Sequence, residues 1–247
     1  MNRVAAYKAI LVLAMSIALN KAKAQQSIAF MPMYGSAKWH TDSNYTNQAG
    51  EHLQINKCLF YTTGWKAIVY NQEKKGRPDT VILSDAHYLI DLNEPNSLKL
   101  PFTIPANAAQ IIFTLGVDSI KNTTGIQTGV LDPARGMFWT WRTGYIMARL
   151  QGISPAANTA GKRFSYDVGG FESPYNAVRP ITLELPENAG IVKKSKTILH
   201  IQTDLSFWFN GKNKISIAQN PNCHNSGKLA MQLADNYQQM FTIVTPL

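Results

Sequence analysis

Short runs of β-branched and aromatic residues, separated by turn-forming clusters, recur through most of this chain and limit the folds it can adopt. Such runs are typical of β-strands, and clusters of Asn, Asp, Gly, Pro and Ser are typical of turns. Many short strands at this spacing predict an all-β fold, an antiparallel β-sandwich or sandwich-like barrel with long loops. The predicted strands cover residues 53–61, 65–70, 81–83, 88–92, 110–117, 137–150, 181–185 and 197–205.

One helix is predicted, near the C-terminal end at residues 227–241, with Ser226 as its N-cap. Leu229, Leu233, Tyr237 and Met240 are spaced to share one of its faces. No internal repeat and no Pro/Ser-rich linker divides the chain. We therefore expect a single domain over residues 25–247.

Residues 1–24 have the pattern of a secretory signal peptide. Arg3 and Lys8 precede an apolar run at residues 9–19, and Ala22-Lys23-Ala24 supplies the small-residue cleavage pattern. The run is shorter than the roughly 20 residues that span a bilayer. We expect cleavage near Ala24-Gln25, a periplasmic or secreted protein, and no membrane span.

The charge of the chain gives no sign of a nucleic-acid partner. The formal net charge is +9, but the predicted signal peptide holds basic residues and no acidic ones, so the mature chain is only mildly basic. The densest basic cluster, residues 193–196, has the composition of a solvated loop.

Cys58 and Cys223 are the two cysteines of the chain. In an oxidising compartment they would either form one long-range disulfide or remain separate thiols, and sequence does not choose between these states.

Motifs of the common enzyme classes are absent. The chain has no Gly-x-Ser-x-Gly elbow, Walker loop, His-Glu-x-x-His or dinucleotide fingerprint, so we expect a protein that is not an enzyme. A hydrolase built on His200 and Asp204 ranks last, because no nucleophile with a supporting base is identifiable. Asp118 and Asp132 flank a loop, where they are expected to cap tight turns rather than bind calcium.

Some side chains are suitable as copper ligands. Met31 and Met33 share one face of the first strand, and His200 lies in a strand of alternating character. Thioethers suit Cu(I) and imidazole suits copper in general, although methionine pairs also fill gaps in ordinary cores. Both readings remain open on residue chemistry alone.

Trp139 and Trp141 stand two residues apart in a run flanked by glycines. Residues two apart on a strand point to the same face. The two indoles are therefore either part of ordinary core packing or a pair of redox-active rings, and spacing does not decide.

Together these stretches resemble the MbnP-like family of exported, copper-associated proteins. The matching segments are Phe113-Thr-Leu-Gly-Val-Asp-Ser119, Asn122, Gly125, Gly129-Val-Leu-Asp-Pro133, Gly136-Met-Phe-Trp-Thr-Trp141, Gly144-Tyr-Ile146, residues 57–61, 88–91 and 169–171, Asp235-Asn236 and Met240-Phe241.

The resemblance implies a β-sandwich-like fold, copper binding, and a dihaem peroxidase partner that oxidises Trp139 or Trp141 to kynurenine. Asp167 stands where the family commonly has histidine, so the metal-ligand candidates here are Asp167, His200, Met31 and Met33. The leading hypothesis is an exported copper-handling protein or a protein substrate of that peroxidase. The alternative is a metal-free extracellular recognition module on the same fold.

Overall fold

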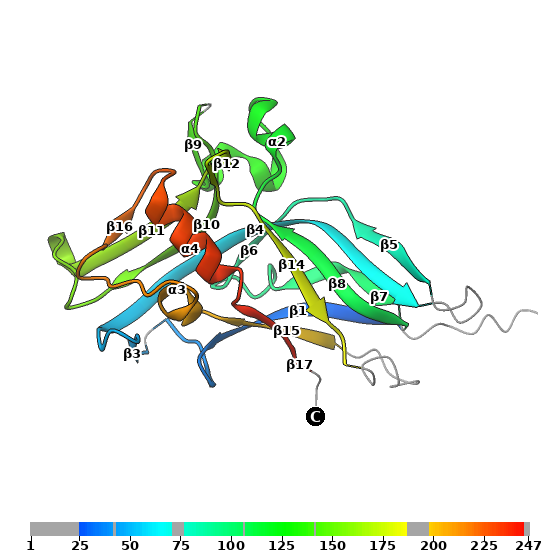
Figure 1. Cartoon of the computed structure of the whole chain (residues 1–247), viewed down its shortest axis with the longest axis horizontal. Helices are drawn as coiled ribbons and strands as arrows, with labels where there is room; N and C mark the ends of the chain where they lie inside the picture. Colours follow the sequence, from blue (N-terminus) through cyan, green and yellow to red (C-terminus); the bar gives the residue numbers. More distant parts are fainter. Residues whose placement is uncertain are drawn as a thin grey trace, which may run out of the picture.

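The computed structural model describes residues 25–41, 43–70, 77–105, 107–140, 142–186 and 198–244 (Figure 1). The predicted signal peptide, Trp141 and the basic cluster at 193–196 lie outside these residues. Within them, no helix is long and apolar enough to cross a membrane.

The largest sheet is built on one long strand, β4 (His52–Tyr70). Its strand order is β14 (Arg179–Glu184), β8 (Ala108–Leu115), β4, β10 (Gly144–Ile153), β11 (Arg163–Gly169) and β16 (Asn222–Cys223). β3 (Tyr45–Thr46), β5 (Pro78–Ser84) and β6 (Tyr88–Asp91) also pair with β4, and β9 (Phe138–Thr140) pairs with β10. β4 pairs with β10 up to Phe60 and with β8 from Thr62 onward. A register shift at Gly64, whose φ is +62°, interrupts the pairing with β8.

A smaller sheet covers one face of this large sheet. It contains β17 (Phe241–Val244), β15 (Ile198–Asp204), β1 (Gln25–Tyr34) and β2 (Ala37–Lys38) in that order, with β7 (Lys99–Pro105) also paired to β1. β12 (Phe171–Glu172) and β13 (Tyr175–Asn176) form a separate hairpin. The helices are α2 (Ser119–Thr123), α3 (Phe207–Asn210) and α4 (Lys228–Tyr237), with 3-10 turns η2 (Gly129–Leu131), η3 (Pro133–Arg135) and η4 (Ala160–Lys162).

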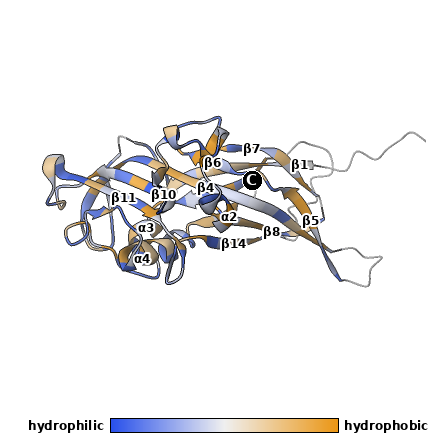
Figure 2. Cartoon of the chain, turned by 90° about the horizontal axis from the view of Figure 1, so that it is seen from above, coloured by the Kyte–Doolittle hydropathy of each residue, from blue (hydrophilic) through white to orange (hydrophobic). Residues whose placement is uncertain are grey.

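Aromatic side chains fill the space between the two sheets. The ring of Phe30 on β1 lies 5.5 Å from that of Phe60 and 6.1 Å from that of Trp65, both on β4. Trp65 stacks on Phe113 of β8 at 4.1 Å, and Phe241 of β17 packs edge-on to the same ring. Hydrophobic and hydrophilic positions alternate along the strands (Figure 2), so each sheet has an inner and an outer face. The predicted all-β sandwich is confirmed.

Local structure differs from the sequence prediction in three places. Residues 137–150 form a hairpin rather than one strand, because the chain turns after Thr140 and re-enters the sheet at Gly144, whose φ is +73°. The C-terminal helix begins after Gly227, which provides no side-chain cap, and ends at Tyr237. β1 and β15 pair in parallel, within an otherwise largely antiparallel fold.

The two cysteines are buried free thiols. Register places Cys58 beside Leu150, Leu150 beside Tyr166, and Tyr166 beside Cys223. Three strand spacings separate the thiols, about 14 Å. That exceeds the roughly 7 Å Cα separation that a disulfide tolerates, so the structure decides for separate thiols.

A carboxylate just before β4 attaches the segment after α3 to the large sheet. Glu51 accepts hydrogen bonds from Asn47 Nδ2, from Ser216 Oγ, and from the backbone N–H groups of Ile217 and Ala218, at 2.7–3.0 Å. Burial by itself raises the pKa of Glu51, but these hydrogen bonds outweigh burial and hold its pKa below the usual value.

Replacement of Glu51 by Gln is expected to lower the free energy of unfolding at pH 7 by about 1–3 kcal/mol, because charge-assisted hydrogen bonds are lost. A lowered folded-state pKa means that the stabilisation is complete above the unfolded-state pKa of about 4.3 and is lost as pH falls below it. Urea unfolding of both proteins between pH 7 and 3 should therefore show the difference shrinking in acid. Glu94→Gln, in an exposed turn, is the control and should match wild type.

Candidate functional site

The segments with the most distinctive sequence gather at one end of the sandwich. α2, β9 and β12 project together beyond the sheets, at the top of Figure 1. α2 follows β8, β9 precedes β10, and β12 follows β11, so strands of the large sheet fix where these segments begin or end.

Asn122 holds this end together. Its side chain is almost fully buried, and its Nδ2 donates to the carbonyls of Val117 and Asp118 at 2.9 Å. Its Oδ1 accepts from the backbone N–H of Tyr145 at 2.9 Å. A Cβ atom at Gly144 would collide with this Oδ1, so the glycine is needed for both its positive φ and its lack of a side chain. The buried amide thus joins α2 to the β9–β10 hairpin.

Two buried tyrosines and two aspartates shape the loop between α2 and β9. Tyr61 and Tyr145 donate through their hydroxyls to the carbonyls of Val130 and Leu131. Asp118 caps α2 through Lys121 N–H, and Asp132 caps η3 through Ala134 N–H. Both aspartates cap turns, as the sequence predicted.

Trp139 lies on β9 with its ring over β11. Its Cζ3 and Cη2 atoms would be 2.7 and 2.9 Å from a Cβ atom placed on Gly169. Gly169 therefore leaves the space that the indole occupies. The preceding residue, Phe138, packs its ring against Tyr145 at 4.9 Å. Trp139 is half-buried, whereas Trp65 and Trp208 are completely buried and Trp39 is 8% exposed.

Asp167 lies two residues before Gly169 on β11 and is engaged on both carboxylate oxygens. Arg149 Nε, on the neighbouring strand β10, donates to Oδ1, and His224 Nδ1 lies 3.3 Å from Oδ2. An ionised carboxylate only accepts, so Nδ1 of His224 carries the hydrogen. Both Asp167 and Arg149 are mostly buried, while the His224 side chain is 51% exposed. The result is a buried ion pair with an imidazole at its edge.

Met31, Met33 and His200 lie together on a different sheet. The β1–β15 register pairs Ala29 with His200 and Met31 with Gln202, so Met31 is a diagonal neighbour of His200 on the outer face. Met33 pairs with Asp204 two residues further along. The Nδ1 atom of His200 is buried and has no hydrogen-bond partner in the described part of the chain.

The predicted site residues therefore fall into two separate groups. On β10 and β11, Ala148 and Tyr166 share the inner face, so Arg149 and Asp167 face outward from the large sheet. His200 and the methionines face outward from the small sheet, on the opposite side of the sandwich. Among the described residues, no group of three or more His, Cys, Asp or Glu side chains is arranged to hold a metal ion.

The His200–Asp204 pair considered for a hydrolase is not formed. Four residues on one strand span about 13 Å. Asp204 instead accepts from the backbone N–H groups of Gly35 and Ser206.

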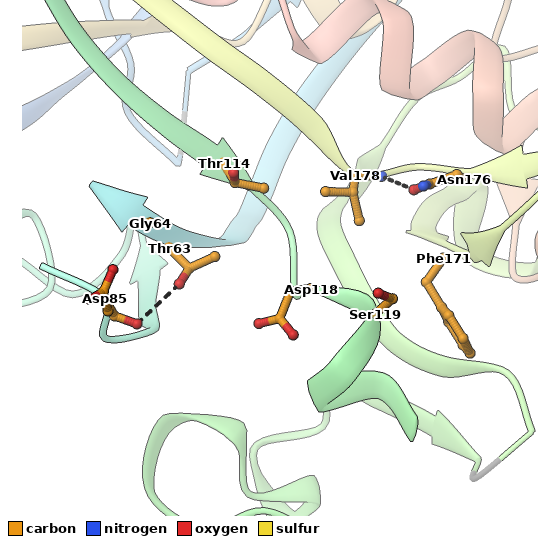
Figure 3. Close-up of a pocket in the computed structure, with 9 residues that line it drawn as sticks. All are labelled: Thr63, Gly64, Asp85, Thr114, Asp118, Ser119, Phe171, Asn176 and Val178. Atoms are coloured by element: carbon orange, nitrogen blue, oxygen red, sulfur yellow. Dashed lines mark hydrogen bonds between the residues drawn. The ribbon is translucent and has the colours of Figure 1, made fainter. Parts of the chain in front are cut away.

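Sequence reasoning missed Arg149, His224 and an open pocket beside α2. The pocket has a volume of about 490 Å³, and Asp85, Asp118 and Phe171 lie on its walls (Figure 3). Arg149 stands in an apolar run, which is a signal for a paired charge. His224 belongs to a loop, and nothing in its surrounding sequence connects it to Asp167.

Comparison with known proteins identifies the family of this chain. A family model described as MbnP matches residues 23–225, which is most of the chain. The chain belongs to the MbnP family. Among solved structures, MbnP from Methylosinus trichosporium is similar with a TM-score of 0.50 and 12% sequence identity, covering 81% of this chain and 82% of that one. At this identity the likeness concerns the fold alone. No curated protein matches.

Within this MbnP family member, much of the recognisable sequence has a structural role. Asn122 and Gly144 join α2 to the hairpin, Asp118 and Asp132 cap turns, and Gly169 makes room for Trp139. Of these residues, Gly169 is the one shown to accommodate the partly exposed indole.

The contribution of the Arg149–Asp167 ion pair to the free energy of unfolding can be measured. Replacement of Arg149 by Met leaves the Asp167 carboxylate without its main partner, and we expect a loss of about 3–5 kcal/mol in unfolding free energy. The double variant Arg149→Met/Asp167→Leu should be more stable than Arg149→Met, because no buried charge is left unpaired. Guanidinium unfolding measures both.

Arg163→Met is the matched control, since Arg163 is exposed at the start of β11. Its stability should stay within about 0.5 kcal/mol of wild type. Equal losses for Arg149→Met and Arg163→Met would contradict the pairing.

Proposed function

We propose that this protein is an exported MbnP family member that serves as the protein substrate of a dihaem peroxidase, with Trp139 as the residue that is oxidised. The proposal rests on the solvent exposure of the Trp139 side chain. Among the described tryptophans, Trp139 alone is not buried, and it lies at the projecting end of the molecule where a partner protein has access.

The chemistry is the conversion of an indole to kynurenine. The peroxidase would use two molecules of hydrogen peroxide to insert two oxygen atoms across the C2–C3 bond of the indole, which breaks to give N-formylkynurenine and two molecules of water. Hydrolysis then releases formate and leaves kynurenine. In this reaction the MbnP family chain presents the ring, and the partner supplies the oxidising equivalents.

The surroundings of Trp139 suit a substrate ring. Gly169 and the β9–β10 pairing hold the indole against β11, so its orientation toward a docked partner is fixed. Long-range electron transfer does not require that the haem of the partner touch the indole. The half-buried position of the Trp139 ring is therefore compatible with its oxidation.

Mass spectrometry of protein co-expressed with the peroxidase tests the proposal. We expect the peptide containing Trp139 to gain the mass of one oxygen atom and lose that of one carbon atom, with fragment ions placing the change at Trp139. A change at Trp141 alone would contradict the choice of Trp139. Peptides containing the buried Trp65 and Trp208 should be unchanged and act as internal controls. An unmodified Trp139–Trp141 peptide, with active peroxidase present, would reject the proposal.

Copper handling is a second candidate, and only one of the predicted ligand groups fits it. Asp167 does not fit, because both oxygens are engaged and a cationic guanidinium occupies its side. His200 fits better, since its Nδ1 is a buried nitrogen without a hydrogen-bond partner among the described residues, and Met31 offers a thioether beside it. Imidazole with thioether is a donor set that suits Cu(I).

Titration of the mature chain with Cu(I) against a chromophoric chelator tests this candidate. Wild type should bind one equivalent, and His200→Ala and Met31→Leu should each weaken binding by about tenfold or more. His40→Ala, at an exposed position, should leave the affinity unchanged. No binding by wild type would favour a metal-free recognition module. Equal loss in all three variants would show that copper is not held by His200 and Met31.

A further inference from the structure

The Trp139 indole meets β11 through the benzene half of its ring. The indole atoms nearest to Gly169 are Cζ3 and Cη2, which would lie 2.7 and 2.9 Å from a Cβ atom placed on that glycine. In the numbering used for indole these atoms are C5 and C6. The Trp139 side chain as a whole is half-buried, so the part of the ring away from C5 and C6 keeps contact with solvent.

The need for space, rather than backbone conformation, explains the glycine at position 169. Its φ lies outside the left-handed region, whereas the next residue, Gly170, has a φ of +115°. The backbone at Gly169 therefore does not by itself exclude an L-residue. A methyl group there would meet the indole and, at 2.8 Å, the carbonyl oxygen of Tyr145. The missing side chain lets the indole lie directly on the strand backbone.

Backbone pairing fixes the position from which the indole reaches Gly169. Phe138 of β9 pairs with Tyr145 of β10, and Ile146 of β10 pairs with Gly169 of β11. The ring of Phe138 also packs against that of Tyr145 at 4.9 Å. The β9 backbone that carries Trp139 is thus held at a set distance from β11, and so is the indole.

The bond that breaks when kynurenine forms belongs to the other half of the indole. The ring is planar and rigid, and C2 lies at the end of its long axis opposite C5 and C6. Oxidation at C2 and C3 takes one oxygen atom from each of two peroxide molecules, breaks the bond between these carbons and releases two molecules of water.

Hydroxylation of the benzene half competes with this reaction. It uses one peroxide molecule, converts a C–H bond at C5 or C6 to C–OH and releases one molecule of water. Close-packed atoms leave no room for an attacking oxygen species. Contact of C5 and C6 with β11 therefore disfavours hydroxylation at these two carbons.

We propose that Gly169 is a specificity-determining residue for the oxidation of Trp139. By admitting the benzene half of the indole onto the β11 backbone, it shields C5 and C6 and leaves the C2–C3 bond as the site where oxygen enters. This role rests on the proposed function and adds to it the reason why the product is kynurenine rather than a hydroxytryptophan.

Hydroxyl radicals, generated from hydrogen peroxide and an iron chelate, test the shielding on the whole mature chain without a peroxidase. N-acetyltryptophanamide in the same solution is the unshielded reference. Chromatography and mass spectrometry of the digested chain, with authentic hydroxytryptophan standards, identify which carbon of Trp139 was oxidised. We expect the share of C5- and C6-hydroxylated product at Trp139 to be less than about half of that in the reference.

Gly169→Ala should raise this share, because the indole must move away from β11 to accommodate the methyl group. Gly161→Ala, in the exposed turn at the other end of β11, is the matched control and should keep the wild-type share. Equal shares in wild type and reference, or in the two variants, would overturn the proposal. If Gly169→Ala does not fold, the comparison of wild type with the reference decides alone.

This experiment and the co-expression test can fail independently. The radicals need no partner protein, so equal shares in wild type and reference would reject the shielding by Gly169 and leave the proposed function standing. An unmodified Trp139 in the presence of active peroxidase would instead reject the proposed function.

Discussion

Edge-to-face packing of Phe30 against Phe60, Trp65 and Phe113 is the interaction on which the rest of this structure depends. It joins a strand of the small sheet to the two central strands of the large one. Ring pairs of this kind contribute beyond their buried area, by about 0.5–1.5 kcal/mol each. Because aromatic and aliphatic side chains occupy most of the inner faces, the charged side chains and candidate metal ligands described above lie on the outer faces and at the loop end.

This difference between inner and outer faces explains why the candidate functional residues lie in separate places. His200 and Met31 lie outside the small sheet, Asp167 and Arg149 outside the large sheet, and Trp139 at the end where the loops project. An ion pair fills the position around Asp167, where a resident metal would need free ligand atoms. The fold of the MbnP family is thus maintained here with the Trp139 indole packed against Gly169 and with both oxygens of the Asp167 carboxylate engaged.

The sequence predicts most of the strands because alternation and turn chemistry are local signals. Residues 53–70 show it best, where two predicted strands merge into β4 across the Gly64 bulge. Asp118 and Asp132 were also predictable as caps, since capping involves residues only two or three positions away. The 137–150 segment misled the strand assignment because its turn, closed by Thr140 and Thr143, contains no Asn-Gly or Pro-Gly signal.

Contacts between residues far apart in the chain could not be predicted from the sequence. The parallel pairing of β1 with β15 joins strands at opposite ends of the chain, and no local pattern sets it. The approach of His224 to Asp167 depends on where β16 docks, and the pocket beside α2 depends on three separate loops meeting. These features carry much of the candidate chemistry, so the site was less predictable than the fold.

The separation of Cys58 from Cys223 by two intervening strands also has a consequence for how the protein matures. Its native state contains no cross-link that an oxidase must introduce or an isomerase must correct. Acquisition of the native fold is then governed by noncovalent packing, and a change in ambient redox potential leaves its covalent framework untouched. An oxidant reaching this molecule meets a partly exposed indole before it meets a cysteine thiol.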